Sequence, residues 1–281
     1  MDLNDDKSHP KAHLLLQLLR RNAREFRDRI FMYGEFQLDK LRPRSNSRAM
    51  DPVDLIRQLE RALGKSLETF SQETALAEIE KAAIEGQQAL AARQPAFEMF
   101  HDADLALARL CYTLARLRRP TIVVETGVAH GLTSAFFLQA LSVNRNGELW
   151  SIDLPPLRNG SKWELGCLIP LHLRDRWHIL HGASRRVLPQ LISRLSAIDI
   201  FLHDSLHTYR NMKCEFHTVW PKLSAGGILL SDDVELNRAF EQFTYRSSVL
   251  FAAVGREEKK DSHFGVIIKK EPVAVVPEDG R

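Results

Sequence analysis

The chain of 281 residues is 44 % hydrophobic and 27 % charged, which is enough to bury a full core in one large domain or in one domain with an appendage. A net charge of +3 is too small to indicate nucleic acid as a partner, and no apolar run approaches the roughly 20 residues that span a bilayer. The three cysteines are scattered, without a C-x-x-C pair or a disulfide framework, so a reducing cytoplasm is the simplest setting.

The first 49 residues are basic, with eleven Lys and Arg against seven Asp and Glu. Residues 1–12 are expected to be disordered. A helix is predicted from His13 to about Tyr33, where Gly34 would end it. One interpretation is a basic surface helix that binds a membrane or an acidic partner. The other is an appendage that packs on the domain or on a second subunit, and we favour the appendage. Homo-oligomer formation through the N-terminal helices is an expectation of that interpretation.

Two further helices are predicted between residues 50 and 100. Asp51 can cap the first, Pro52 fits its first position, and Gly64 can end it. The second extends from about Ser71 to Gly86. The predicted organisation is a basic helical extension (1–49), a helical region (50–100), a main domain (101–270) and a tail (271–281).

In the main domain a helix over 102–117 precedes alternating strands and helices. Short β-branched and apolar runs predict seven strands, over 122–124, 148–152, 177–180, 197–202, 228–231, 248–254 and 264–269. A polar loop joins the last two, which predicts an antiparallel C-terminal hairpin. The fold class is therefore α/β, with a Rossmann-like, mostly parallel seven-stranded sheet and helices on both faces.

Acidic residues follow four of these strands: Glu125, Asp153, Asp204 and the pair Asp232-Asp233. In an open parallel sheet these strand ends converge on one crevice. Acids scattered at random would not fall there so regularly. This regularity is the strongest physical indication of a functional site.

The loop after the first strand holds Gly127 and Gly131. Glycine allows positive φ and lets a ligand come close to the backbone. Asp153, after the second strand, is well placed to accept hydrogen bonds from ribose hydroxyls. The third glycine of the dinucleotide fingerprint is missing, which argues against an NAD-linked oxidoreductase. An ordinary strand–helix turn with incidental glycines is the alternative.

Asp204, Asp232 and Asp233 follow neighbouring strands and are expected to face one another. Closely packed carboxylates repel, and a bound cation with a preference for oxygen ligands, such as Mg²⁺, removes that problem. The alternative is that Asp233 caps the next helix and Asp232 ends the strand in a turn. His207, three residues after Asp204, suits a general base, whereas His203 is expected to point to the opposite side of the strand.

The stretch E-T-G-V-A-H-G-L-T-S, with Asp153 after the next strand, resembles the cofactor loop of class I S-adenosylmethionine-dependent methyltransferases. The resemblance covers roughly residues 100–270. It implies that S-adenosylmethionine is the cofactor, with the loop on its methionine part, Asp153 on the ribose and Ser184 near the adenine, although Ala183 stands where that family commonly has an acid. The implied cofactor-binding residues are Glu125, Gly127, His130, Gly131, Ser134, Asp153, Ser184 and Asp204.

A second stretch, H-D-S-L-H-T-Y followed by L-S-A-G-G-I-L-L-S-D-D-V, resembles a branch of metal-dependent small-molecule O-methyltransferases that includes enzymes acting on sugar hydroxyls of natural products. The likeness implies that Asp204, Asp232 and Asp233 bind Mg²⁺ or another divalent cation and that His207 is the base. The branch also resembles cephalosporin hydroxylase proteins.

The expected function is methylation of a small-molecule hydroxyl. The alternatives are a cephalosporin-hydroxylase-like or NAD-linked oxidoreductase, an RNA or protein methyltransferase, and a non-catalytic nucleoside-binding protein. The irregular segment after Asp153, which contains Trp163, is either a substrate lid or a surface excursion.

Overall fold

The computed structural model describes residues 17–93, 103–154, 157, 164–246, 248–258 and 261–271. The predictions for residues 1–12, for Trp163 and for most of the tail lie outside this part of the chain. None of the helices in the described part combines the length and apolar character that a membrane crossing needs.

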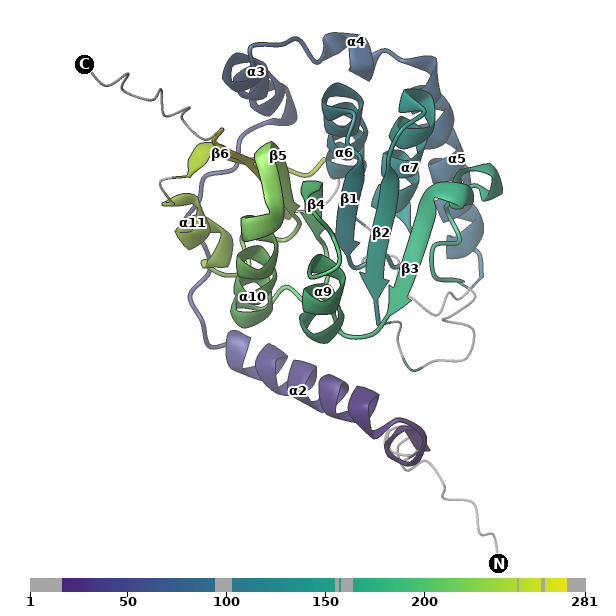
Figure 1. The fold of residues 1–281 in the computed structure, drawn as a ribbon, viewed down its shortest axis with the longest axis vertical. Coiled ribbons are helices and arrows are strands. Elements are labelled where there is room, and N and C mark those ends of the chain that lie inside the picture. Colours follow the sequence, from purple (N-terminus) through teal and green to yellow (C-terminus); the bar gives the residue numbers. More distant parts are fainter. Residues whose placement is uncertain are drawn as a thin grey trace, which may run out of the picture.

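Seven strands form one sheet in the order β3-β2-β1-β4-β5-β7-β6 (Figure 1). Their bounds are β1 Ile122–Thr126, β2 Glu148–Asp153, β3 Trp177–His181, β4 Ile198–His203, β5 Leu223–Ser231, β6 Val249–Arg256 and β7 His263–Lys269. Neighbours among β1 to β5 pair in parallel, and β7 pairs antiparallel with both β5 and β6. The predicted mostly parallel Rossmann-like sheet with an antiparallel C-terminal hairpin is confirmed.

Helices cover both faces of the sheet because successive strand residues point to opposite faces. On one face α3 (Pro52–Leu63), α5 (Thr74–Ala91), α6 (Leu105–Arg118) and α7 (Leu132–Asn144) share a hydrophobic cluster with Val123 of β1. On the other, α9 (Ser184–Ile192), α10 (Tyr209–Val219) and α11 (Ala239–Thr244) share a second cluster with Val124. Short helical turns occur at α4 (Glu68–Ser71), η2 (Leu171–Arg176) and η3 (Trp220–Lys222).

The helix α3 begins and ends as predicted. The Asp51 side chain accepts a hydrogen bond from the Val53 amide, and Gly64 ends the helix in the left-handed conformation at φ 63°. The next helix was predicted with wrong bounds, since α5 continues past Gly86. A Cβ at Gly86 would lie 2.6 Å from the Leu168 side chain, so glycine at this position serves packing rather than termination.

The predicted start of the first helix, at His13, lies outside the described residues, and its predicted end at Gly34 is wrong. Residues 17–21 are helical, and Asn22 then interrupts the helix and caps α2 (Ala23–Asp39) by accepting a hydrogen bond from the Glu25 amide. Gly34 lies inside α2, because a single glycine weakens a helix without ending it. Figure 1 shows α2 beside the strand ends, next to α9 and α10, so this helix packs on its own domain.

Candidate active site

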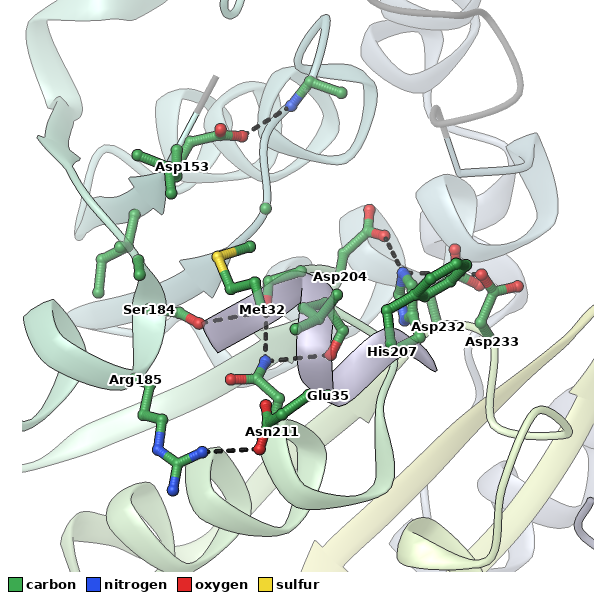
Figure 2. A pocket seen from close by; sticks show the side chains of 18 of the residues that line it. Met32, Glu35, Asp153, Ser184, Arg185, Asp204, His207, Asn211, Asp232 and Asp233 are labelled. Atoms are coloured by element: carbon green, nitrogen blue, oxygen red, sulfur yellow. Dashed lines mark hydrogen bonds and ion pairs between the residues drawn. The ribbon is translucent and has the colours of Figure 1, made fainter. Parts of the chain in front are cut away.

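A cavity of about 1030 Å³ lies at the carboxyl ends of the parallel strands (Figure 2). The loops that follow β1 to β5 line it, and α2 covers it. The predicted site residues in its lining are Gly127, Asp153, Ser184, Asp204, His207, Asp232 and Asp233. Small-molecule sites span roughly 300–1,000 Å³, so this cavity has room for a nucleoside cofactor and a second small molecule.

Asp153 ties the glycine loop to the second strand. One carboxylate oxygen, Oδ2, accepts hydrogen bonds from the amides of Val128 at 2.6 Å and Ala129 at 3.1 Å. Burial raises the pKa of Asp153, and these two backbone hydrogen bonds oppose that rise. Asp153 therefore fixes the loop while it also lines the cavity, where the sequence predicts a ribose.

Gly127 brings two loops of the site together. It has φ 84°, and a Cβ on it would overlap the backbone carbonyl of Asp204. Directly beside it, the Asp204 amide donates to the Thr126 carbonyl at 2.7 Å. Glycine was expected here to let a ligand approach the backbone, and the structure shows that the close neighbour of Gly127 is the loop that carries Asp204.

Four predicted cofactor-binding residues lie behind the cavity wall: Glu125, His130, Gly131 and Ser134. The Glu125 carboxylate is fully buried and accepts hydrogen bonds from Thr133 at 2.7 Å, Ser134 at 2.6 Å and Ser151 at 2.8 Å. Burial raises its pKa to about 7 against these hydrogen bonds. In this structure the four residues support the loop from behind.

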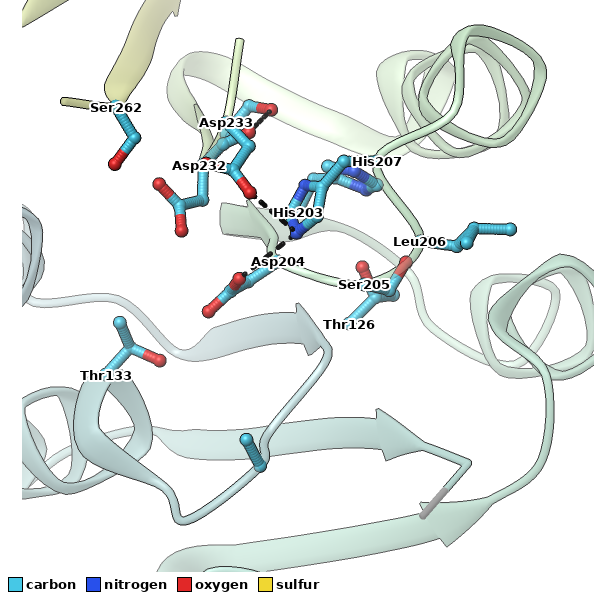
Figure 3. Close-up of polar contacts among 12 residues, drawn as sticks. Thr126, Thr133, His203, Asp204, Ser205, Leu206, His207, Asp232, Asp233 and Ser262 are labelled. Atoms are coloured by element: carbon cyan, nitrogen blue, oxygen red, sulfur yellow. Dashed lines mark hydrogen bonds and ion pairs between the residues drawn. The ribbon is translucent and has the colours of Figure 1, made fainter. Parts of the chain in front are cut away.

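His207 lies between two carboxylates at the other end of the cavity (Figure 3). Its Nε2 is 3.7 Å from Asp204 Oδ1 and 3.6 Å from Asp233 Oδ2. Asp233 takes a left-handed conformation at φ 51°, which Asp tolerates better than most residues. It does not cap a helix at Glu235, because α11 begins only at Ala239. The alternative role for Asp233 is therefore wrong.

The carboxylates at this end have suitable chemistry for a hard cation but are not gathered around one point. Asp204, Asp232 and Asp233 offer oxygen atoms, which Mg²⁺ prefers. Among the described residues, no group of three or more His, Cys, Asp or Glu side chains has an arrangement that could hold a metal ion. The His207 ring stands between Asp204 and Asp233 instead.

Comparison with known proteins agrees with this architecture. Residues 124–234 match the family model described as a methyltransferase domain. The stretch that matches begins in β1 and ends just after Asp233, so it contains every predicted site residue.

Solved structures share the class I methyltransferase fold. The methyltransferase PaMTH1 of Podospora anserina, bound to S-adenosylhomocysteine, matches with TM-score 0.54 and 15 % identity over 69 % of this chain and 93 % of its own. An O-methyltransferase from Bacillus cereus, also with S-adenosylhomocysteine, matches with TM-score 0.51 and 16 % identity over 70 % and 92 %. TomG from Streptomyces achromogenes, an O-methyltransferase involved in tomaymycin synthesis and bound to S-adenosylmethionine, matches with TM-score 0.53 and 16 % identity over 71 % and 91 %. No curated protein sequence matches significantly.

A buried polar network behind His207 was missed in the sequence of residues 124–234. His203 and Glu215 are fully buried and lie 2.7 Å apart, Nδ1 to Oε2. Thr126, Ser205 and Asn211 also donate to the Glu215 carboxylate. His203 indeed faces away from the cavity lining, and its ring stands edge-on to that of His207 at 5.3 Å. The overlooked signal was an acid on the apolar face of α10, beside Met212, Phe216 and Val219.

The covering helix α2 was also missed as part of the site. Its residues in the cavity lining are Asp28, Phe31, Met32, Glu35 and Phe36. From the sequence, this segment was interpreted only as a basic surface helix or an appendage. The signal was the spacing of Asp28, Met32 and Glu35, which places an acid, a flexible apolar side chain and another acid on one helical face.

Proposed function

We propose that the protein is an S-adenosylmethionine-dependent methyltransferase that acts on a hydroxyl group of a small molecule. The observation that carries the proposal is the shared cavity of Asp153, Ser184 and His207 within a methyltransferase domain. Asp153 would accept hydrogen bonds from the ribose, and Ser184 would lie at the adenine. The bound ligands of the three similar structures support this cofactor.

In the proposed reaction His207 removes the proton from the substrate hydroxyl. The oxygen then attacks the methyl carbon in line with the sulfonium, the carbon–sulfur bond breaks, and its electron pair remains on sulfur as S-adenosylhomocysteine forms. The proton on the imidazole would lie between the carboxylates of Asp204 and Asp233, which compensate its charge. Alignment of oxygen, methyl and sulfur by the cavity supplies the rest of the acceleration.

The proposal includes Mg²⁺ or another divalent cation held by Asp204, Asp232 and Asp233. Its support is the oxygen-only donor set at the end of the cavity that holds His207. When bound, such an ion lowers the pKa of a hydroxyl that it contacts. Binding requires these carboxylates to gather, since they do not form a ligand cluster in this structure.

A small-molecule substrate is favoured over RNA or protein because the acceptor end of the cavity is walled by Asp232, Asp233 and Asp261 rather than by cations. No disulfide joins Cys111, Cys167 and Cys214, which all lie in the described part of the chain, and this supports a reducing, cytoplasmic setting.

Calorimetric titration tests the cofactor and the metal. The purified protein is titrated with S-adenosylhomocysteine and, separately, with NAD⁺, each in Mg²⁺ and in EDTA. We expect micromolar binding of S-adenosylhomocysteine alone, weakened at least tenfold in Asp153→Asn. Mn²⁺ titration of wild type and Asp233→Asn tests the metal site without an activity assay. Binding of NAD⁺ instead, or of neither ligand, would overturn the cofactor assignment.

A screen of hydroxyl compounds, read by release of S-adenosylhomocysteine, tests the base. His207→Ala should bind S-adenosylhomocysteine normally and lose turnover by about 10²–10⁴-fold. His217→Ala, an exposed histidine on α10, is the matched control. Unchanged turnover in His207→Ala would remove His207 from the mechanism.

A further inference from the structure

The helix α2 presents one polar face to the body of the protein. Asp28, Met32, Glu35 and Asp39 are spaced by three or four residues and therefore lie on the same side of the helix. The first three line the cavity. In Figure 2, Met32 and Glu35 lie among the labelled residues of the nucleoside side, Ser184 and Arg185, and those of the acceptor side, Asp204 and His207.

Charged groups fasten this face to the start of α9 and α10. Arg185 Nη1 is 2.8 Å from Glu35 Oε1, and Arg186 Nε is 2.8 Å from Asp28 Oδ2. The two arginines directly follow Ser184, the residue assigned to the adenine. At the other end of the helix, the carboxylate of Asp39 accepts a hydrogen bond from the Tyr209 amide at 3.1 Å.

Apolar burial contributes little to this attachment. Within the described residues, no side chain of α2 belongs to any of the hydrophobic clusters of the domain or packs against one. The one buried residue of α2 is charged, Glu35. The Asp28–Arg186 pair is partly exposed, so it is weak and screened by salt, whereas the Glu35 side chain in the pair with Arg185 is only 3 % exposed and is screened less. Since α2 shares no hydrophobic cluster with the domain, this attachment can open while the core stays intact.

We propose that α2 is a latched lid over the nucleoside end of the cavity, in which Met32 lies against the bound nucleoside and the pairs Glu35–Arg185 and Asp28–Arg186 hold the helix closed. The proposal rests on the proposed function, because it takes the nucleoside of S-adenosylmethionine as the covered ligand. A cofactor that lies between Asp153 and Ser184 is covered by α2 and leaves when the helix lifts. The two ion pairs then set the rate at which the enzyme releases S-adenosylhomocysteine after methyl transfer.

The experiment is the dissociation rate of S-adenosylhomocysteine from the full-length protein, measured by surface plasmon resonance. The latch variant is Asp28→Asn with Glu35→Gln, and the contact variant is Met32→Ala. Leu38→Ala is the control on the same helix, because Leu38 is 58 % exposed and does not line the cavity. Asp54→Asn, which breaks the exposed pair with Arg57 on α3, is the control for loss of an ion pair.

We expect the latch variant to release the ligand about tenfold faster than wild type at low salt, with both controls within about twofold. About 0.5 M salt should accelerate release from wild type toward the rate of the variant and leave the variant unchanged. Met32→Ala should also release faster, and an unchanged rate would remove Met32 from the contact.

Two results would contradict the proposal that α2 is a lid, and both can be distinguished from failure of the proposed function. Release from the latch variant at the wild-type rate shows that the ion pairs do not retain the ligand. If salt does not change the release rate from wild type, the ion pairs again do not retain the ligand. This result needs no substitution, so it holds even if the latch variant misfolds. Failure of wild type itself to bind S-adenosylhomocysteine overturns the proposed function and, with it, the ligand of the lid.

Discussion

Glu125 is a carboxyl group enclosed by the protein at the end of β1. Because burial outweighs the hydrogen bonds from three hydroxyls, its pKa rises from 4.5 to about 7. The folded protein therefore binds a proton that the unfolded chain releases between these two pH values. Its contribution to stability is fully present below about pH 4.5 and is lost as the pH rises through 7, and a shift of this size corresponds to about 3 kcal/mol.

Glu125→Gln removes this titration while it keeps the size of the side chain and an oxygen acceptor for the hydroxyl groups. Relative to wild type, the free energy of unfolding of the variant should improve by up to about 3 kcal/mol between pH 5 and pH 8.5. Urea denaturation at a series of pH values measures the difference. The pKa of Glu235 is also raised to about 7, but Glu235 titrates in both proteins, so its contribution cancels from the difference between them. A difference that stays constant with pH would contradict the prediction.

At the scale of single residues, the sequence predicted the position of the site more accurately than the contacts of each site residue. Acids at strand ends predicted a crevice, and Asp153, Asp204, Asp232 and Asp233 all line it. Glu125 follows the same rule but faces the interior, because alternation along β1 turns its side chain toward Thr133 and Ser134 of α7. Which face a strand residue meets depends on the packed helices, and one sequence does not fix that.

At the scale of elements, Glu215 joins α10 to two strands and to the loop that carries Asp204 and His207. Burial alone would raise its pKa, but the charge of His203 and the surrounding hydrogen bonds lower it to about 2. The carboxylate therefore stays ionised inside the protein. Its contribution is present above the unfolded value of 4.5 and is lost as the pH falls toward 2.

Glu215→Gln leaves His203 without its charged partner. We expect a loss of about 3–5 kcal/mol in the free energy of unfolding at pH 7, a loss that shrinks below pH 4.5. Urea denaturation of Glu215→Gln, His203→Gln and the double variant forms a cycle that isolates the pair. Glu85→Gln, from an exposed pair with Lys81, should change stability by less than about 0.5 kcal/mol. Additive effects of the two substitutions would show that the pair is not coupled.

Elements with local signals were predictable, and those defined by distant contacts were not. The bounds of α3 followed from Asp51, Pro52 and Gly64, because a cap and a left-handed glycine act within a few residues. The site role of α2 rests on ion pairs to Arg185 and Arg186, about 150 residues away in the chain. No periodicity within residues 13–33 contains that information.

At the scale of the whole molecule, the sheet order explains the position of the cavity. The chain moves from β1 outward to β3, then returns to β4 on the other side of β1. The helices that follow β1 and β4, α7 and α10, consequently pack on opposite faces of the sheet, and the cavity lies at the strand ends where the order reverses. The alternation of strands and helices in the sequence predicted a mostly parallel sheet with the site at its strand ends, whereas the strand order itself was not predicted.

The helices of residues 50–93 and the sheet should unfold as one unit, because α3 and α5 bury side chains in the same cluster as α6, α7 and β1. Leu59 of α3 is fully buried in that cluster. Leu59→Ala should therefore lower the free energy of unfolding by about 2–5 kcal/mol, whereas Leu41→Ala, at an 84 % exposed position, should change it by less than about 0.5 kcal/mol.

Far-ultraviolet circular dichroism and tryptophan fluorescence follow this unfolding with different probes. Circular dichroism reports all helices, whereas the four tryptophans, at positions 150, 163, 177 and 220, lie far in sequence from α3, and two of them, Trp150 and Trp177, report β2 and β3. If residues 50–93 and the sheet form one cooperative unit, Leu59→Ala shifts both transitions by the same amount. An earlier helical transition with an unchanged fluorescence midpoint would show instead that residues 50–100 fold separately, as the predicted boundary at residue 101 implies.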